Sequence, residues 1–171
     1  VTDETERIAA LALQGPTSAE VLRRAGFDID ALRPFRLAEF PLAAGRVTIS
    51  RTGFTGDLGY ELWTAPEQAL ALWDLLFAAG ARHGIRPVGS EALNLARLEA
   101  GFIVAGADFV PAHTCLRQDR LCSPIEMGLG WMIDWDKGHF TGKAALAAER
   151  ARGPAWAFVG LEIDGNIPAE G

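Results

Sequence analysis

The sequence predicts an α+β fold, in which short strands are interspersed with helices. Residues 45–52 alternate apolar Val47 and Ile49 with polar neighbours, which is the pattern of a strand with one buried face. Thr17 stands three residues before Glu20, a capping-box spacing that marks a helix start. The chain has 171 residues, of which 49% are hydrophobic, so it can bury a core.

The first third of the chain predicts a sheet with one early helix. Residues 8–13 form an apolar run that Gly15-Pro16 ends, and the helix opened by Thr17 stops at Gly26. The remaining strand segments are 33–40, with Pro34 near its start, then 45–52 and 60–64. We expect the last two to form a hairpin whose long connection is rich in glycine.

Two helices are predicted next. A second capping box, Thr64 with Glu67, precedes residues 66–82, which are apolar on almost all sides and are therefore expected to be largely buried. Another helix begins at Ser90 and ends at Gly101. We expect its apolar side chains to pack inward, namely Leu93, Leu95, Ala96 and Leu98.

The last third alternates predicted strands with a loop and a helix. Residues 102–108, 127–135 and 156–163 have strand character, whereas 110–124 has no period and is expected to be a surface loop. The alanine-rich segment 141–152 predicts a helix that Gly153-Pro154 stops.

Charge and cysteine content exclude several classes of protein. The net charge of −6 and the absence of a Lys/Arg stripe argue against a nucleic-acid partner. No uncharged run is long enough to span a membrane. His113, Cys115 and Cys122 match no common zinc spacing, so we expect no metal site. Two cysteines suit a reducing compartment, and because the chain begins at Val1 we expect it to be part of a longer protein.

The segment Arg51-Thr-Gly-Phe-Thr-Gly-Asp-Leu-Gly-Tyr-Glu-Leu62 has a glycine at every third position. One interpretation is a hairpin turn. The other is a loop that lets a flat ligand approach Phe54 and the carboxylate of Glu61, which could accept hydrogen bonds from two adjacent N–H groups of a heterocycle.

Two other segments carry charged residues with open roles. Arg97 and Glu99 lie on the predicted helix 90–101 but are two positions apart, so they do not face each other. They are expected to be solvated or to find separate partners. Lys143 lies near a helix start, against the macrodipole, and could be a functional lysine or, by simpler reasoning, a solvent-facing one.

Taken together and in order, these segments resemble the glycine cleavage T-protein family of aminomethyltransferases and related tetrahydrofolate-dependent enzymes. The matching segments are Leu11-Ala-Leu-Gln-Gly-Pro16, Arg51 to Leu62, Arg97-Leu-Glu-Ala-Gly101, Gly128-Leu-Gly-Trp131 and Phe140-Thr-Gly-Lys-Ala-Ala-Leu146.

The resemblance implies a domain arrangement. Residues 1–154 correspond to the later, C-terminal portion of the family's folate-binding domain, and residues 155–171 to the first strand of its C-terminal β-barrel domain. The family's catalytic aspartate belongs to an earlier part that this sequence does not contain, so no catalytic residue is assigned here.

The resemblance also implies a folate site. Glu61 stands at the family's pterin-binding glutamate, while Phe54 and Phe102 stand at aromatic positions that line the pocket, with Trp131 in a further family motif. We expect the aromatic rings to sandwich the pterin. Leu93 departs from the family, whose aminomethyltransferases carry an arginine there.

These matches imply a one-carbon transferase that moves an aminomethyl or methyl group to tetrahydrofolate. The donor would be a small molecule or a lipoyl carrier protein, and the location cytoplasmic, or the mitochondrial matrix in a eukaryote. The alternative is a non-catalytic folate-binding module with a regulatory or tRNA-modification role. We expect no nucleic-acid and no membrane partner, and the oligomeric state is left open.

Overall fold

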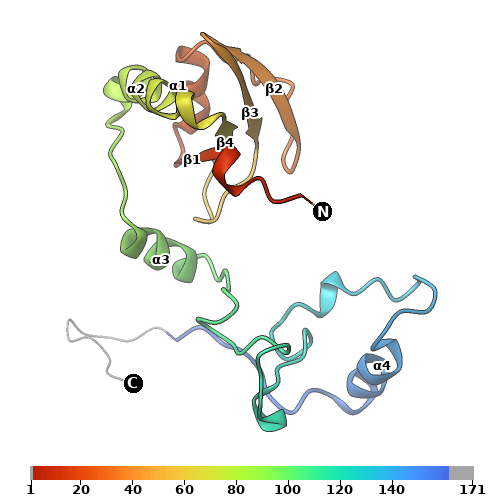
Figure 1. Cartoon of the computed structure of the whole chain (residues 1–171). Helices are drawn as coiled ribbons and strands as arrows, with labels where there is room; N and C mark the ends of the chain where they lie inside the picture. Colours follow the sequence, from red (N-terminus) through yellow and green to blue (C-terminus); the bar gives the residue numbers. More distant parts are fainter. Residues whose placement is uncertain (1, 162–171) are drawn as a thin grey trace. The chain divides into compact units, whose positions relative to one another are not determined.

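The structure, a computed structural model, describes residues 2–161 (Figure 1). The chain divides into two compact units at Phe102, and each is described by itself. No helix in the described part of the chain is long and apolar enough to cross a membrane.

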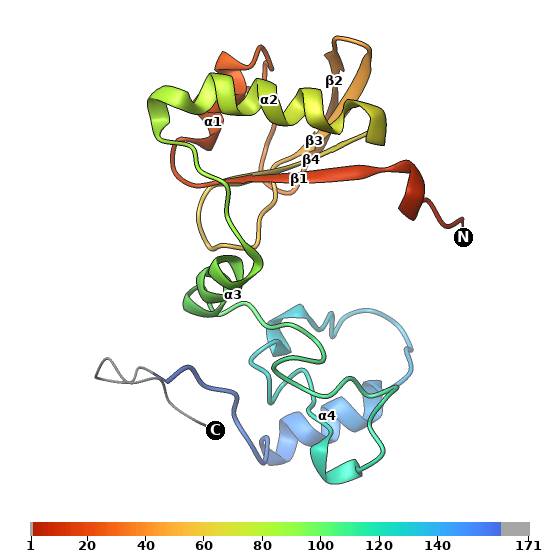
Figure 2. The ribbon, with the colours of Figure 1, turned by 60° about the vertical axis from the view of Figure 1, so that its left-hand side comes forward.

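The first unit is built on a four-stranded antiparallel sheet (Figures 1 and 2). Its strands pair in the order β1-β4-β3-β2. The register places Leu11 opposite Leu62, and Leu62 opposite Ile49, so one row of apolar side chains crosses the sheet. The strands are β1 (Ala9–Gln14), β2 (Leu37–Leu42), β3 (Gly45–Ser50) and β4 (Gly59–Thr64).

Two helices, α1 (Ser18–Arg24) and α2 (Ala69–Gly80), cover one face of this sheet (Figure 2). The core between them is closed by side chains with no exposed surface, which are Leu22, Val47, Ile49, Leu62 and Leu72. Arg24 Nε of α1 donates to the Ala79 carbonyl of α2 at 3.2 Å, which joins the two helices at their polar edge. The predicted α+β fold is confirmed in this unit.

The opposite face of the sheet carries the residues that alternate with the core. Ala12, Glu61 and Ser50 form one cross-strand row on it, and Trp63 and Thr48 stand on the next. Successive side chains of a strand point to opposite faces, so Glu61 projects away from α1 and α2. This open face is where the predicted site lies.

Helix α2 differs from its prediction. A 3-10 turn over Pro66–Gln68 leads into it and another, Ala81–His83, follows it. The expectation of a helix buried on nearly all sides is wrong, because Leu72 and Leu76 face the core while Leu70 is 72% exposed. A helix lying on one face of a single sheet has only one covered side, whatever its composition.

Neither predicted capping box forms its side-chain bond. Thr17 does precede α1, but its backbone has ψ 5°, whereas a capping residue needs extended geometry to aim its oxygen at the helix N–H groups. Thr64 is the last residue of β4, and its hydroxyl donates to the Arg46 carbonyl at 3.0 Å. The spacing of the two capping boxes therefore predicted where helical structure begins, but not the side-chain hydrogen bonds that a capping box implies.

Helix α3 (Ser90–Glu99) follows the prediction in its bounds but not in its burial. Leu95 is 62% exposed and Leu98 48%, and Leu93 is also exposed, so the expected inward packing of these leucines is wrong. The buried side chain of this helix is Arg97. The contacts that hold α3 lie at its C-terminal end, where Ala100 approaches Gly56 and Arg97 bonds the Phe102 carbonyl.

The second unit contains helix α4 (Lys143–Arg152) among turns, with 3-10 turns at Gln118–Arg120 and Gly130–Met132. The predicted loop 110–124 is confirmed, but the predicted strands at 102–108 and 127–135 are wrong. Glycines explain the second case: Gly128 has φ 72°, which bends the chain where a strand would continue.

The last predicted strand is also not formed within the described residues. Residues 156–161 have no regular structure, and 162–163 lie outside the described part, as does most of the expected barrel segment 155–171. The barrel domain therefore stays a prediction. In the first unit, β2 begins at Leu37 rather than residue 33, because Phe35 takes a left-handed backbone with φ 60° just before it.

Candidate functional site

Glu61 lies in the middle of the open sheet face. It is half-buried on β4, with Ala12 of β1 on one side and Ser50 of β3 on the other. The small methyl group of Ala12 leaves room above the sheet beside the carboxylate. A charged group in this place is accessible from the open face while its stem is held by two neighbouring strands.

A short chain of hydroxyl groups orients this carboxylate. Thr52 Oγ1 donates to Glu61 Oε2 at 2.5 Å, and the Thr52 hydroxyl is itself in contact with the hydroxyl of Ser50. Within the described residues, Glu61 Oε1 accepts no hydrogen bond. One oxygen is therefore fixed by the protein, and the other remains available to an N–H donor.

The glycine-rich loop between β3 and β4 closes over Gln14, the last residue of β1. Gln14 Nε2 donates to the Tyr60 carbonyl at 3.3 Å, and Thr55 Oγ1 donates to Gln14 Oε1 at 3.2 Å. A Cβ at Gly53 would come within 2.2 Å of Gln14 Oε1, and one at Gly59 within 1.9 Å. A side chain at either position would therefore displace the Gln14 amide from its two hydrogen bonds.

The third glycine of the loop serves a different contact. Gly56 has φ 77°, and a Cβ there would lie 2.6 Å from the Ala100 side chain at the end of α3. The backbone of the loop at Gly56 therefore contacts the methyl group of Ala100 at the C-terminal end of α3. This meeting point defines where the residues after α3 are placed.

Phe54 and Phe102 come together at this point. Their ring centroids are 5.3 Å apart and the ring planes are inclined by only 17°, so the rings stack on each other. A flat ligand between two rings needs about 7 Å, or two contact distances of about 3.5 Å. In this structure the two rings contact each other and form a two-ring platform with partly exposed edges, and the expected sandwich around a ligand stays a prediction.

Arg97 differs most from what the sequence indicated. It was expected to be solvated or to find a partner of its own, and it is only 4% exposed, while Glu99 is exposed. Its Nε donates to Asn94 Oδ1 at 2.8 Å, and a terminal nitrogen donates to the Phe102 carbonyl at 3.1 Å. The sequence carried no signal for this burial beyond the residue's place in a matching segment.

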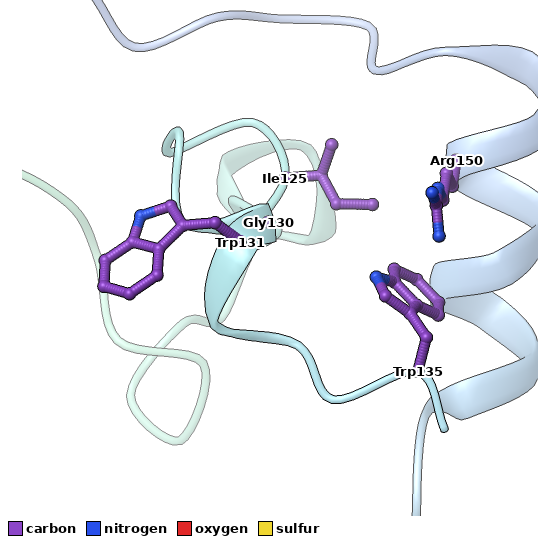
Figure 3. Close-up of a pocket in the computed structure, with 5 residues that line it drawn as sticks. All are labelled: Ile125, Gly130, Trp131, Trp135 and Arg150. Atoms are coloured by element: carbon purple, nitrogen blue, oxygen red, sulfur yellow. The ribbon is translucent and has the colours of Figure 1, made fainter. Parts of the chain in front are cut away.

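Trp131 belongs to the second unit, where it is 79% exposed. It borders a pocket of about 320 Å³ that is also lined by Ile125, Gly130, Trp135 and Arg150 (Figure 3). The Arg150 guanidinium lies over the Trp135 ring at 4.8 Å from its centroid, a cation–π contact, whereas the Trp131 ring points away from that pair.

Lys143 is not the solvent-facing residue that simpler reasoning favoured. Its Nζ donates to the Trp135 carbonyl at 2.9 Å and to the Lys137 carbonyl at 2.5 Å. The ammonium group thus closes the turn before α4. Its position at the helix start is explained by these two carbonyls, which compensate for the unfavourable macrodipole.

Among the described residues, no three His, Cys, Asp or Glu side chains come together in a group that could hold a metal ion. Both cysteines are free thiols. An ion pair joins Arg117 to Asp119, and the hydrogen bonds from the guanidinium lower the pKa of the Asp119 carboxyl below its usual value.

The four-stranded antiparallel sheet with α1 and α2 on one face defines a small α+β domain. The family model described as the GCVT N-terminal domain matches residues 1–137. The chain belongs to this glycine cleavage T-protein family, as its motifs indicated.

Individual relatives agree with this assignment. The aminomethyltransferase of Halothermothrix orenii is 37% identical over 173 residues, which cover all of this chain and 46% of that protein. The aminomethyltransferase of Geobacillus kaustophilus is 39% identical, covering 99% of this chain and 45% of the relative. The chain therefore spans less than half the length of the curated relatives it matches.

A solved structure agrees with the fold. The crystal structure of glycine cleavage system aminomethyltransferase T from Bartonella henselae superimposes with a TM-score of 0.69 at 31% identity, covering 86% of this chain and 38% of that one. The relatives carry the name of a transferase, which supports the leading interpretation and not the regulatory or tRNA-modification alternative.

Proposed function

We propose that this chain carries the pterin-binding part of a tetrahydrofolate-dependent aminomethyltransferase, with Glu61 as its anchoring residue. The observation that carries the proposal is the carboxylate of Glu61, oriented by Thr52 on the open sheet face and bordered by a loop whose glycines lie against the Gln14 amide. Family membership supplies the reaction class.

The donor set of the site fits a pterin. A pterin edge presents an N–H and an amino group side by side, and a carboxylate can accept both in a bidentate pair of charge-assisted hydrogen bonds. Glu61 Oε1 is available, and Oε2 retains a second lone pair beside the bond from Thr52. Because Thr52 already holds one carboxylate oxygen, less conformational freedom is lost when the carboxylate binds a ligand.

The aromatic platform fits the same ligand. Phe54 and Phe102 offer apolar surface to a flat ring, and neither contributes a hydroxyl donor. Tetrahydrofolate supplies the one-carbon chemistry when it is bound. The contribution of these residues is to hold and orient the pterin, which converts an encounter into a reaction of fixed geometry.

The remainder of the proposal rests on the family. The one-carbon donor is an aminomethyl group on a lipoyl carrier protein, with a small-molecule donor as the second candidate. The barrel domain expected from residue 155 onward, the residues that perform proton transfer and the Trp131 contact with folate are likewise proposals.

Calorimetry with tetrahydrofolate on the 171-residue chain tests the anchor. Glu61→Gln keeps the size of the side chain but removes the charge, and losing a hydrogen bond to a charged group costs about 1.5–3 kcal/mol, or about 10- to 150-fold in affinity. Glu39→Gln is the matched control, because Glu39 pairs with Arg46 at 3.2 Å two strands away. Its affinity should stay within about twofold.

Two results would count against the proposal. If Glu61→Gln binds as tightly as the unsubstituted chain, Glu61 is not the pterin anchor. If the unsubstituted chain binds no tetrahydrofolate, the site needs more than this chain contains, and the assignment of the pterin anchor to the chain itself fails.

A further inference from the structure

Arg97 holds both backbone polar groups of Phe102. The Phe102 N–H donates to the Arg97 carbonyl at 2.8 Å, while the Arg97 guanidinium donates to the Phe102 carbonyl at 3.1 Å. One residue therefore fixes the peptide groups on both sides of the second platform ring. To make the second of these bonds, the side chain must extend past the end of α3 as far as the Phe102 carbonyl while remaining buried.

The backbone part of this grip is a Schellman motif at the end of α3. Gly101 has φ 74°, its N–H donates to the Leu98 carbonyl at 2.9 Å, and the Phe102 bond to Arg97 is the longer 6→1 member of the pair. The motif ends the helix and turns the chain so that Phe102 leaves it toward the glycine-rich loop.

The side-chain part depends on a fixed guanidinium. Asn94, one turn earlier on α3, accepts from Arg97 Nε at 2.8 Å, and this bond sets the plane of the group. A planar fork with donors in fixed directions can bond Asn94 and the Phe102 carbonyl together. A lysine has one ammonium group on a flexible stem and cannot reproduce that geometry.

We propose that Arg97 is a positioning residue for the aromatic platform. It places the Phe102 ring against Phe54 at 5.3 Å and thereby creates one continuous apolar surface from two partly exposed rings. The close approach of Gly56 to Ala100 holds the glycine-rich loop, which carries Phe54, against the segment that carries Phe102. As a contribution to ligand binding, this inference rests on the proposed folate site, whereas the ring stack itself can be measured without ligand.

The first experiment measures the stack in the 171-residue chain without ligand. Nuclear Overhauser contacts between selectively labelled Phe54 and Phe102 rings should be strong in the unsubstituted chain. We expect them to be lost in Arg97→Lys and weakened in Asn94→Ala, which leaves the arginine in place and changes only an exposed residue. Arg82→Lys, at an exposed position after α2, is the control and should retain them.

Folding is monitored in each variant by the contacts within the sheet, such as those between Leu11 and Leu62. If Arg97→Lys retains both the sheet contacts and the ring contacts, the positioning role is overturned. If it retains the sheet contacts and loses the ring contacts, the role is supported. Should Arg97→Lys fail to fold, Asn94→Ala decides between the same two results.

The second experiment links the stack to binding. Phe102→Ala should weaken tetrahydrofolate binding about 2- to 10-fold. Arg97→Lys should weaken it by no more than that, and should add nothing in the Phe102→Ala background because its effect passes through that ring. Additive losses would overturn the proposal. Unchanged affinity in Glu61→Gln would instead refute the proposed pterin anchor, while the ligand-free ring contacts would still test Arg97.

Discussion

The contact between Gly59 and Gln14 permits a quantitative test of the loop. In Gly59→Ala, the new methyl group would be placed 1.9 Å from Gln14 Oε1 and 2.4 Å from its Cδ, so the amide must move. Gly59 has an ordinary strand backbone, which means that alanine is disfavoured by the collision with Gln14 and not by its dihedral angles. The variant therefore isolates a side-chain collision.

The expected cost follows from the bonds that the moving amide loses. Gln14 gives up its bonds to the Tyr60 carbonyl and the Thr55 hydroxyl, each worth about 0.5–1.5 kcal/mol, or about 1–3 kcal/mol together. Alanine recovers about 0.5–1 kcal/mol because it has less backbone freedom than glycine in the unfolded chain. The net loss in unfolding free energy should be about 0–2.5 kcal/mol, so the coupling measured in the cycle is the sharper quantity.

Urea unfolding of Gly59→Ala, Gln14→Ala and the double variant gives a double-mutant cycle that measures the interaction between the two positions in the free energy of unfolding. In the Gln14→Ala background the methyl group meets no amide, so the second substitution should be neutral or stabilising, with a coupling of about 1–3 kcal/mol. Gly138→Ala, where a Cβ meets no atom within 4 Å, is the control. Equal losses from Gly59→Ala in both backgrounds would refute the steric account.

Three further predictions address the core, the helix end and one ion pair. Leu62→Ala removes a side chain with no exposed surface and should lower the free energy of unfolding by about 2–5 kcal/mol in urea titrations. Gly101→Ala, at φ 74°, should cost about 1–2 kcal/mol in the same assay, and no loss would contradict the left-handed turn. The Asp119 carboxyl should titrate below the ordinary value of about 3.9 by NMR, and Arg117→Gln should raise its pKa toward that value. Because the folded pKa is the lower one, any stabilisation from this exposed pair is present above the unfolded pKa and lost as pH falls through the folded one.

Local patterns in the sequence were sufficient for much of the first unit. The period-2 alternation of Val47 and Ile49 predicted β3, and the helix ends followed from glycines that take left-handed conformations, such as Gly26 and Gly101. These features depend on near neighbours in the chain. They are readable because a glycine stop or an alternating strand has the same meaning in any fold.

The second unit and the site's supporting residues could not be obtained in this way. The apolar residues of 127–135 suggested a strand, but Gly128 and the turn at Gly130–Met132 prevent one. The buried state of Arg97 and the role of Gln14 depend on contacts between distant segments. A sequence pattern shows that a residue is charged or polar, but its partners in distant segments are known only from the folded structure.

The pairing of β1 with β4 has a consequence for how the molecule is made. Gln14 and Tyr60, which are joined by a hydrogen bond, stand 46 positions apart, and β1 lies at the edge of the sheet with β4 as its neighbour. During synthesis the first strand must wait until the fourth has left the ribosome. Contacts of such long range slow folding, so we expect the surroundings of Glu61 to form after the β2–β3 hairpin has closed.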